Sequence, residues 1–125
     1  MPEEPLEVPK GSIVLVDFPF TDLFGAKLRP ALVLYEGYLD VTAAAITSEI
    51  PQKLLPTDLL IFQRTPSFEG TGLKEDSIIL IDKIATIEKT FIKGILGEAN
   101  ADLRRRVNTK IAQFLMFDDG PANGL

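Results

Sequence analysis

The chain has 125 residues, 46% of them hydrophobic, and contains neither cysteine nor histidine. This is the size of one domain that can bury a core without covalent cross-links. The missing residue types exclude disulfides, thiolate metal sites, cysteine nucleophiles and histidine bases. Any catalysis must therefore rest on carboxylates, arginine or lysine, hydroxyl groups or backbone amides.

The formal net charge of -5 originates at the two ends of the chain. Five of the 18 acidic residues are Glu3, Glu4, Glu7, Asp118 and Asp119, and without them 13 acidic residues face 13 basic ones. A formally neutral body would steer RNA only weakly by global charge, although it can still present a locally basic groove.

The ends also differ from the body in composition. Residues 1–10 are acidic and proline-rich, residues 118–125 are polar, and we expect both to be flexible tails around one domain over residues 11–117. The start lacks the pattern of a signal peptide, and the apolar runs are too short to span a membrane. We therefore expect a soluble, cytoplasmic protein without membrane contact.

The body is predicted to be rich in strands. Ser12–Phe20 is apolar on both faces and precedes a polar loop over residues 21–27. Two apolar runs, Leu28–Tyr35 and Tyr38–Thr47, flank Glu36-Gly37 and predict a hairpin. Weaker strands are expected at Asp58–Phe62, Ser77–Lys83 and Ile92–Leu96.

The last element is predicted to be an amphipathic helix capped by Asn100. Its apolar stripe repeats at intervals of three and four and consists of Leu103, Val107, Ile111, Phe114 and Leu115. The run Arg104–Arg106 lies off this stripe and is typical of a solvated face, with RNA or partner contact as the alternative. Short strands with one helix predict a mostly β fold with α, a compact barrel against which the helix packs.

Arg29-Pro30 is the first candidate for chemistry. Proline favours extended backbone in the residue before it, so Arg29 is fixed where the loop enters the second strand. A guanidinium held there suits bidentate phosphate binding. The alternative is an exposed arginine that merely begins a strand.

Thr47-Ser48 is the second candidate, because two hydroxyl groups end a strand shortly before Pro51. They are suited to donate to a phosphate or to position a ribose hydroxyl. The alternative is that threonine is a good strand residue and serine begins a loop.

The hairpin register decides whether Arg29 and Thr47 share a site. A three-residue turn with Gly37 left-handed sets Arg29 opposite Ala43 and Thr47 on the same face. A two-residue turn sets Arg29 opposite Ala44 and Thr47 on the other face. Even the first register leaves four residues, about 13 Å, between them along the strand. The residues alone leave a shared site open.

The other polar residues give no clear motif. The carboxylates of the body are scattered without the close spacing of a metal site, so we expect no metal ion. Gly70 and Gly72 do not form a phosphate-binding loop, because no Gly-Lys-Ser/Thr follows and no helix begins there.

Three segments in series resemble the motifs of the MazF/PemK ribonuclease toxins, over about residues 11–117. The first is GSIVLVDFPF at 11–20 with LRPALVL at 28–34, the second AAITS at 44–48, and the third SIILIDKIATIEK at 77–89. Departures from the family pattern are Ser12 in place of aspartate, an atypical loop over 21–27, and Lys83 where glutamine is common.

The resemblance implies a small SH3-like β-barrel with a C-terminal helix, usually a homodimer. It implies the toxin of a toxin–antitoxin system, a cofactor-free endoribonuclease that cuts single-stranded RNA into 2′,3′-cyclic phosphate and 5′-OH ends. By position, Arg29 and Thr47 are the catalytic pair. The implied partner is an antitoxin whose flexible acidic tail occupies the RNA groove.

The expected groove is lined by five further positions, which we predict to contact RNA: Phe20, Thr21, Lys27, Ser48 and Lys83. The general base and the cleavage sequence do not follow from the resemblance. Two rival interpretations stay open. One is a barrel that binds RNA or a protein partner without cutting, and the other is a purely structural dimer module.

Overall fold

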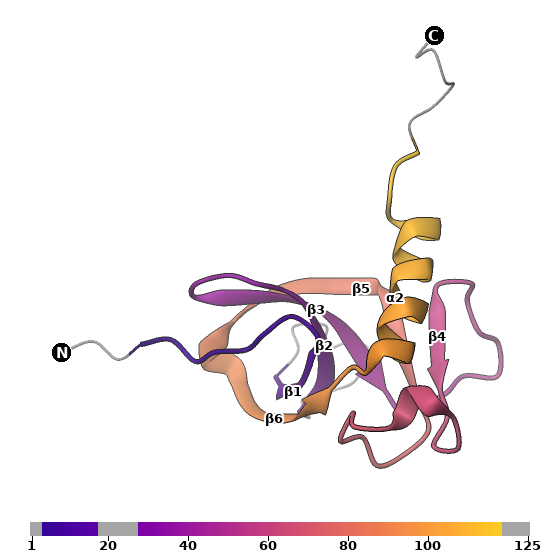
Figure 1. Cartoon of the computed structure of the whole chain (residues 1–125), viewed down its shortest axis with the longest axis horizontal. Helices are drawn as coiled ribbons and strands as arrows, with labels where there is room; N and C mark the ends of the chain where they lie inside the picture. Colours follow the sequence, from indigo (N-terminus) through magenta and orange to yellow (C-terminus); the bar gives the residue numbers. More distant parts are fainter. Residues whose placement is uncertain (1–3, 18–27, 119–125) are drawn as a thin grey trace, which may run out of the picture.

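The computed structural model describes residues 4–17 and 28–118, which form one antiparallel sheet and a C-terminal helix (Figure 1). The sheet order is β4-β5-β3-β2-β1-β6. The prediction of a mostly β protein with a final helix is confirmed. The elements are β1 (Ser12–Val16), β2 (Arg29–Glu36), β3 (Asp40–Thr47), β4 (Asp58–Ile61), η1 (Pro66–Phe68), β5 (Ser77–Glu88), η2 (Lys89–Phe91), β6 (Ile92–Glu98) and α2 (Ala101–Phe114).

The expected SH3-like barrel is not confirmed, because β4 and β6 are the two edges of the described sheet. The segment 70–72 lies against the β6 edge, where the Glu98 N–H donates to the Gly70 carbonyl over 2.9 Å. Gly72 has a φ of +74°, and a Cβ there would collide with the Leu96 carbonyl oxygen. Two backbones therefore touch at this edge, at a position that only glycine fits.

The core has two layers because the central strands are buried on both faces. In β1, Ile13 packs in the layer under α2, and the next residue, Val14, packs in the opposite layer. This alternation follows from the period of two in a strand. Each fully buried aliphatic side chain contributes roughly 1.5–3 kcal/mol. The layer under α2 includes Ile46, Ile61, Ile79, Ile81, Leu103 and Val107, and the opposite layer includes Val8, Val16, Val33, Val41 and Ile87.

Val8 belongs to this core although the sequence places it in the N-terminal tail. Its side chain is fully buried, and its N–H donates to Glu36 Oε2 over 2.6 Å. Lys89 Nζ lies 3.0 Å from the same oxygen. The packed structure thus begins ahead of the expected boundary at Gly11.

Both hairpin registers considered from the sequence are wrong. β2 and β3 pair as Glu36↔Val41 near the tip and Ala31↔Ala45 further along, with an irregularity between Val33 and Tyr35. The tip closes with the Gly37 N–H donating to the Asp40 carbonyl over 2.8 Å, and Gly37 does not adopt a positive φ. The turn lies later in the chain than expected, between Gly37 and Asp40, and this position together with the extra residue in β2 shifts the pairing.

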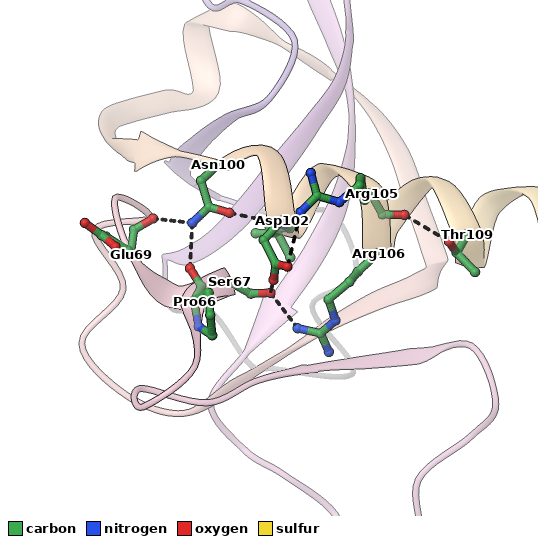
Figure 2. Close-up of polar contacts among 9 residues, drawn as sticks. Pro66, Ser67, Glu69, Asn100, Asp102, Arg105, Arg106 and Thr109 are labelled. Atoms are coloured by element: carbon green, nitrogen blue, oxygen red, sulfur yellow. Dashed lines mark hydrogen bonds and ion pairs between the residues drawn. The ribbon is translucent and has the colours of Figure 1, made fainter.

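The helix begins as predicted, because Asn100 Oδ1 accepts the Leu103 N–H over 2.9 Å. Asn100 Nδ2 also donates to the carbonyls of Pro66 and Glu69, so the same side chain links α2 to η1 (Figure 2). Leu103 and Val107 are buried, whereas Phe114 and Leu115 are exposed where the last turn rises clear of the sheet (Figure 1).

Arg106 corrects the prediction of a solvated arginine face. Its guanidinium donates to Ser67 Oγ over 2.8 Å and to the Leu60 carbonyl over 2.6 Å, and the Ser67 hydroxyl donates to Asp102 (Figure 2). Arg105 remains largely exposed. In the described part of the chain, no helix is long and apolar enough to cross a membrane.

Candidate functional site

Arg29 begins β2 and Thr47 ends β3, and antiparallel pairing brings these two strand ends together. Continuing the pairing Ala31↔Ala45 by two residues sets Arg29 opposite Thr47. Directly opposed residues on one sheet face have Cβ atoms about 5 Å apart. The 13 Å separation expected from the sequence is thereby removed, and the two residues share one face.

Thr47 is buried, with 4% of its surface exposed, and its Oγ1 accepts the Glu49 N–H over 3.0 Å. This bond closes a tight turn directly after the strand. It uses a lone pair of the oxygen, so the hydroxyl proton can still be donated to a ligand. Ser48, between these two residues, is exposed at the rim.

The Arg29 side chain is also largely buried, with 16% exposed, and its Nη2 lies 3.8 Å from Glu49 Oε1. The extended backbone before Pro30 and the pairing of Arg29 with Val16 of β1 fix its position. A guanidinium in this partly desolvated setting interacts with an anion more strongly than one in water.

A hollow of about 370 Å³ lies at these strand ends. One wall carries Arg29, Thr47 and Ser48, and the facing wall is formed by the segment 72–77. The facing wall contributes a cation at Lys74 and a carboxylate at Glu75. The hollow therefore combines two cations, three hydroxyl-bearing side chains and a carboxylate with apolar lining from residues such as Leu15 and Leu96. The cations and hydroxyl groups are suited to bind a phosphate.

The facing wall is held by polar contacts on both sides. Thr71, fully buried, donates its hydroxyl to the Phe68 carbonyl, and its Oγ1 accepts the Leu73 N–H. Gln63 donates its side-chain amide to the Lys74 carbonyl over 2.8 Å and its N–H to Asp76 Oδ1 over 2.7 Å. These bonds fix the backbone from which the Lys74 side chain extends at the hollow.

The structure unites only part of the predicted set. Arg29, Thr47 and Ser48 line one hollow. Lys83 lies instead where the β3–β5 ladder breaks between Ala44↔Ile84 and Ala45↔Leu80, and its Nζ lies 2.8 Å from Asp82. It is not among the described residues that line the hollow. Phe20, Thr21 and Lys27 lie outside the described residues.

The sequence interpretation did not place three charged residues at this candidate site. Lys74 and Glu75 line the hollow, and Glu49 lies 3.8 Å from Arg29. Lys74 and Glu75 lie far from Arg29 in sequence and reach the hollow only through the fold. For Glu49 a signal existed, because it directly follows the Thr47-Ser48 pair. Among the described residues, no group of three or more histidine, cysteine, aspartate or glutamate side chains is placed to hold a metal ion.

The sequence model of the PemK-like, MazF-like toxins of type II toxin–antitoxin systems matches residues 9–115. The chain belongs to this family. The match spans the sheet and α2 and includes every described residue of the hollow. The resemblance seen in the sequence is thereby confirmed. No curated protein sequence matches the chain significantly.

Solved MazF-family structures share the fold of this MazF-like toxin. The Mycobacterium tuberculosis toxin MazF-mt6 superposes with a TM-score of 0.61 at 20% identity, covering 82% of this chain and 93% of that one. A mycobacterial endoribonuclease in complex with its cognate antitoxin gives 0.65 at 19% identity, covering 90% and 100%. Another mycobacterial endoribonuclease gives 0.62 at 20%, covering 89% and 93%. At these identities the likeness shows the fold alone.

Proposed function

We propose that this MazF-like toxin is a metal-independent endoribonuclease that cleaves single-stranded RNA in the hollow at the ends of β2 and β3. The observation that carries the proposal is that Arg29 and Thr47 line one hollow together with a second cation, Lys74. Two structural relatives are named endoribonucleases, which agrees with this activity.

The chemistry requires charge stabilisation at phosphorus. The ribose 2′-oxygen attacks the adjacent phosphodiester, and the bond to the 5′-oxygen breaks, leaving 2′,3′-cyclic phosphate and 5′-OH ends. Arg29 binds the phosphate oxygens that gain charge in the transition state, and the Thr47 hydroxyl donates to one of them. Both groups are largely buried and already oriented, so little reorganisation accompanies the reaction.

The test is cleavage of varied single-stranded RNAs by purified protein in EDTA. Wild type should produce the two end types, identified by mass spectrometry, and Arg29→Ala should lower the rate about 100-fold or more. Arg29→Lys should recover only part of it, because lysine keeps the charge but lacks the planar fork.

Arg105→Ala is the matched control, since it removes an exposed arginine from α2. It should leave the rate unchanged. Intact RNA with wild type in the presence and absence of metal ions would exclude the nuclease. RNA binding without cleavage would instead favour the alternative of a non-catalytic binding module.

The partner is an antitoxin with a flexible acidic tail. Carboxylates on such a tail can occupy the places of RNA phosphates beside Arg29 and Lys74. A glutamate-rich peptide should then inhibit cleavage, more weakly as salt is raised. Inhibition that is unaffected in Lys74→Ala would argue against this site.

We also propose that the toxin is a homodimer and acts in the cytoplasm, where its RNA substrate lies. Sedimentation equilibrium should give twice the chain mass at micromolar concentration. A single-chain mass at every concentration would contradict the dimer without affecting the nuclease proposal.

A further inference from the structure

We infer that Glu49 is the general base of the RNA cleavage, the group that removes the proton from the ribose 2′-OH. The inference rests on the proposed nuclease function and names a residue that this function leaves unassigned. It starts from the turn after β3, where Glu49 is connected to both members of the pair at the strand ends.

The first connection is through the backbone. The Glu49 N–H donates to Thr47 Oγ1 over 3.0 Å, so a buried threonine fixes the position from which the glutamate side chain begins. Thr47 therefore couples the geometry of the phosphate site to that of the carboxylate. The backbone of Glu49 is thus held next to the strand end that carries Thr47, although the glutamate lies on a loop.

The second connection is through the side chains. Glu49 Oε1 lies 3.8 Å from Arg29 Nη2, and 69% of the glutamate side chain is exposed. This distance is too long for a hydrogen bond. The guanidinium can therefore take an RNA phosphate at hydrogen-bond distance in place of Glu49, and the displaced carboxylate remains near it on the turn after β3.

That position is where a base is needed. The 2′-oxygen belongs to the nucleotide whose 3′-phosphate Arg29 binds, so the nucleophile and the phosphate arrive together. A base must reach within hydrogen-bond distance of that oxygen, and an exposed carboxylate adjacent to the phosphate clamp can do so. In a chain without histidine, a carboxylate is the remaining ordinary base for this step.

The proton count balances. The Glu49 carboxylate takes the 2′-OH proton as the oxygen–phosphorus bond forms and the phosphorus–5′-oxygen bond breaks. The departing 5′-oxygen takes a proton from water, and Glu49 returns its proton to the solvent. Arg29 keeps its charge throughout.

Other charged groups line the hollow or lie next to a strand partner of Arg29, and they set the controls. Lys74 and Glu75 lie on the facing wall, and Asp17 follows Val16, the β1 partner of Arg29. Glu75 and Asp17 are the rival carboxylates. Glu88, exposed on β5, serves as a remote carboxylate.

The experiment measures single-turnover cleavage of one short RNA between pH 4 and 8, with the binding affinity for its 2′-O-methyl analogue, which lacks the nucleophile. Glu49→Gln should lower the rate about 100-fold at neutral pH, the low end for a general base. Wild type should lose rate as the pH is lowered, which forms the acid limb of its pH profile, and Glu49→Gln should lack this limb. Affinity for the analogue should be unchanged or higher, since a negative charge is lost.

Glu75→Gln and Asp17→Asn should keep the acid limb of the pH profile, and Glu88→Gln should match wild type. A Glu49→Gln enzyme that retains the acid limb, or loses rate only through weaker analogue binding, would overturn the inference. Loss of the acid limb in Glu75→Gln or Asp17→Asn, but not in Glu49→Gln, would also overturn it. If wild type itself fails to cleave RNA, the nuclease proposal fails; if wild type cleaves and only the Glu49 result differs, this inference alone fails.

Discussion

Arg106 on α2 and Ser67 on η1 are joined by a hydrogen bond of 2.8 Å, although 39 residues separate them in sequence (Figure 2). Ser67 is fully buried and donates its own hydroxyl to Asp102. The serine therefore accepts from one helix residue and donates to another. Because η1 leads into the segment that walls the hollow, this network connects the helix to the candidate site.

Ser67→Ala should destabilise the protein. It removes the partner of a half-buried guanidinium and of a carboxylate, which costs about 1–3 kcal/mol of unfolding free energy. Urea denaturation measures the change. Thr109→Ala, which removes an exposed hydroxyl bonded to the Arg105 carbonyl, should stay within about 0.5 kcal/mol. Equal losses in the two variants would show that the buried network carries no special stability.

Gly72→Ala should be more damaging than Gly94→Ala. Gly72 combines a positive φ with backbone contact to Leu96, whereas a Cβ on Gly94 meets nothing within 4 Å. We expect the first change to lower the free energy of unfolding by about 1–3 kcal/mol or more through backbone strain, and the second to be neutral or slightly stabilising. Thermal melts of both variants test this, and similar melting temperatures would contradict the close approach at β6.

The docking of the N-terminal segment around Val8 onto the core should depend on pH. The N–H of Val8 and then the ammonium of Lys89 lower the pKa of Glu36. A lowered folded-state pKa means that the docked state is favoured fully above the ordinary glutamate pKa, and that this contribution is lost as pH falls through the lowered value.

Hydrogen exchange of the Val8 amide measures this docking. Protection should fall on acidification in wild type and be weaker and less pH-dependent in Glu36→Gln. Glu88→Gln is the matched change on an exposed side chain. A Val8 amide whose protection in wild type does not change across the acid range would contradict the role of Glu36.

Lys74→Ala should weaken RNA binding uniformly across sequences. Loss of one phosphate contact lowers the slope of log K against log salt by about 0.7 for single strands. Fluorescence anisotropy with 2′-O-methyl RNA at several salt concentrations gives this slope. Arg105→Ala, which removes one exposed positive charge on α2, should leave it unchanged. A slope equal to that of wild type in Lys74→Ala would place the RNA elsewhere.

The sequence was sufficient for the element order and for the helix cap. The run predicted as a strand over Ser12–Phe20 is a strand over Ser12–Val16, and residues 18–20 lie outside the described part of the chain. The spacing of Leu103 and Val107 follows local periodicity, and both are buried on α2 as predicted. Asn100 also caps as expected, because capping depends on residues within one turn. These features need no knowledge of distant parts of the chain.

The register of the hairpin was beyond such reasoning. It depends on one extra residue in β2 near Leu34 and on the connection after Glu36, and neither has a sequence signature. The extended strand β5 shows the same limit, since its ladder breaks beside Ala44 and then continues to Glu88. Core packing on both faces and the geometry of the turn together determine the hairpin register.

The wall of the hollow was missed for a different reason. Gly72 was considered only as part of a possible phosphate-binding loop, and Lys74 was not singled out. Their importance arises from contact with β6 and from the bond of the Lys74 carbonyl to Gln63. Arg106 was expected in solvent because helical periodicity says nothing about what η1 places opposite it. Contacts between irregular segments produce no periodic pattern in the sequence, so they cannot be predicted from it.

The irregularity near Leu34 separates the two ends of the β2–β3 hairpin. The pairing at the Gly37 end and the pairing at the Arg29 end differ by one residue, and the irregularity absorbs the mismatch. A change in the length of the tip can therefore be taken up at this irregularity. During evolution the tip can change in length or charge while the strand ends at Arg29 and Thr47 keep their alignment.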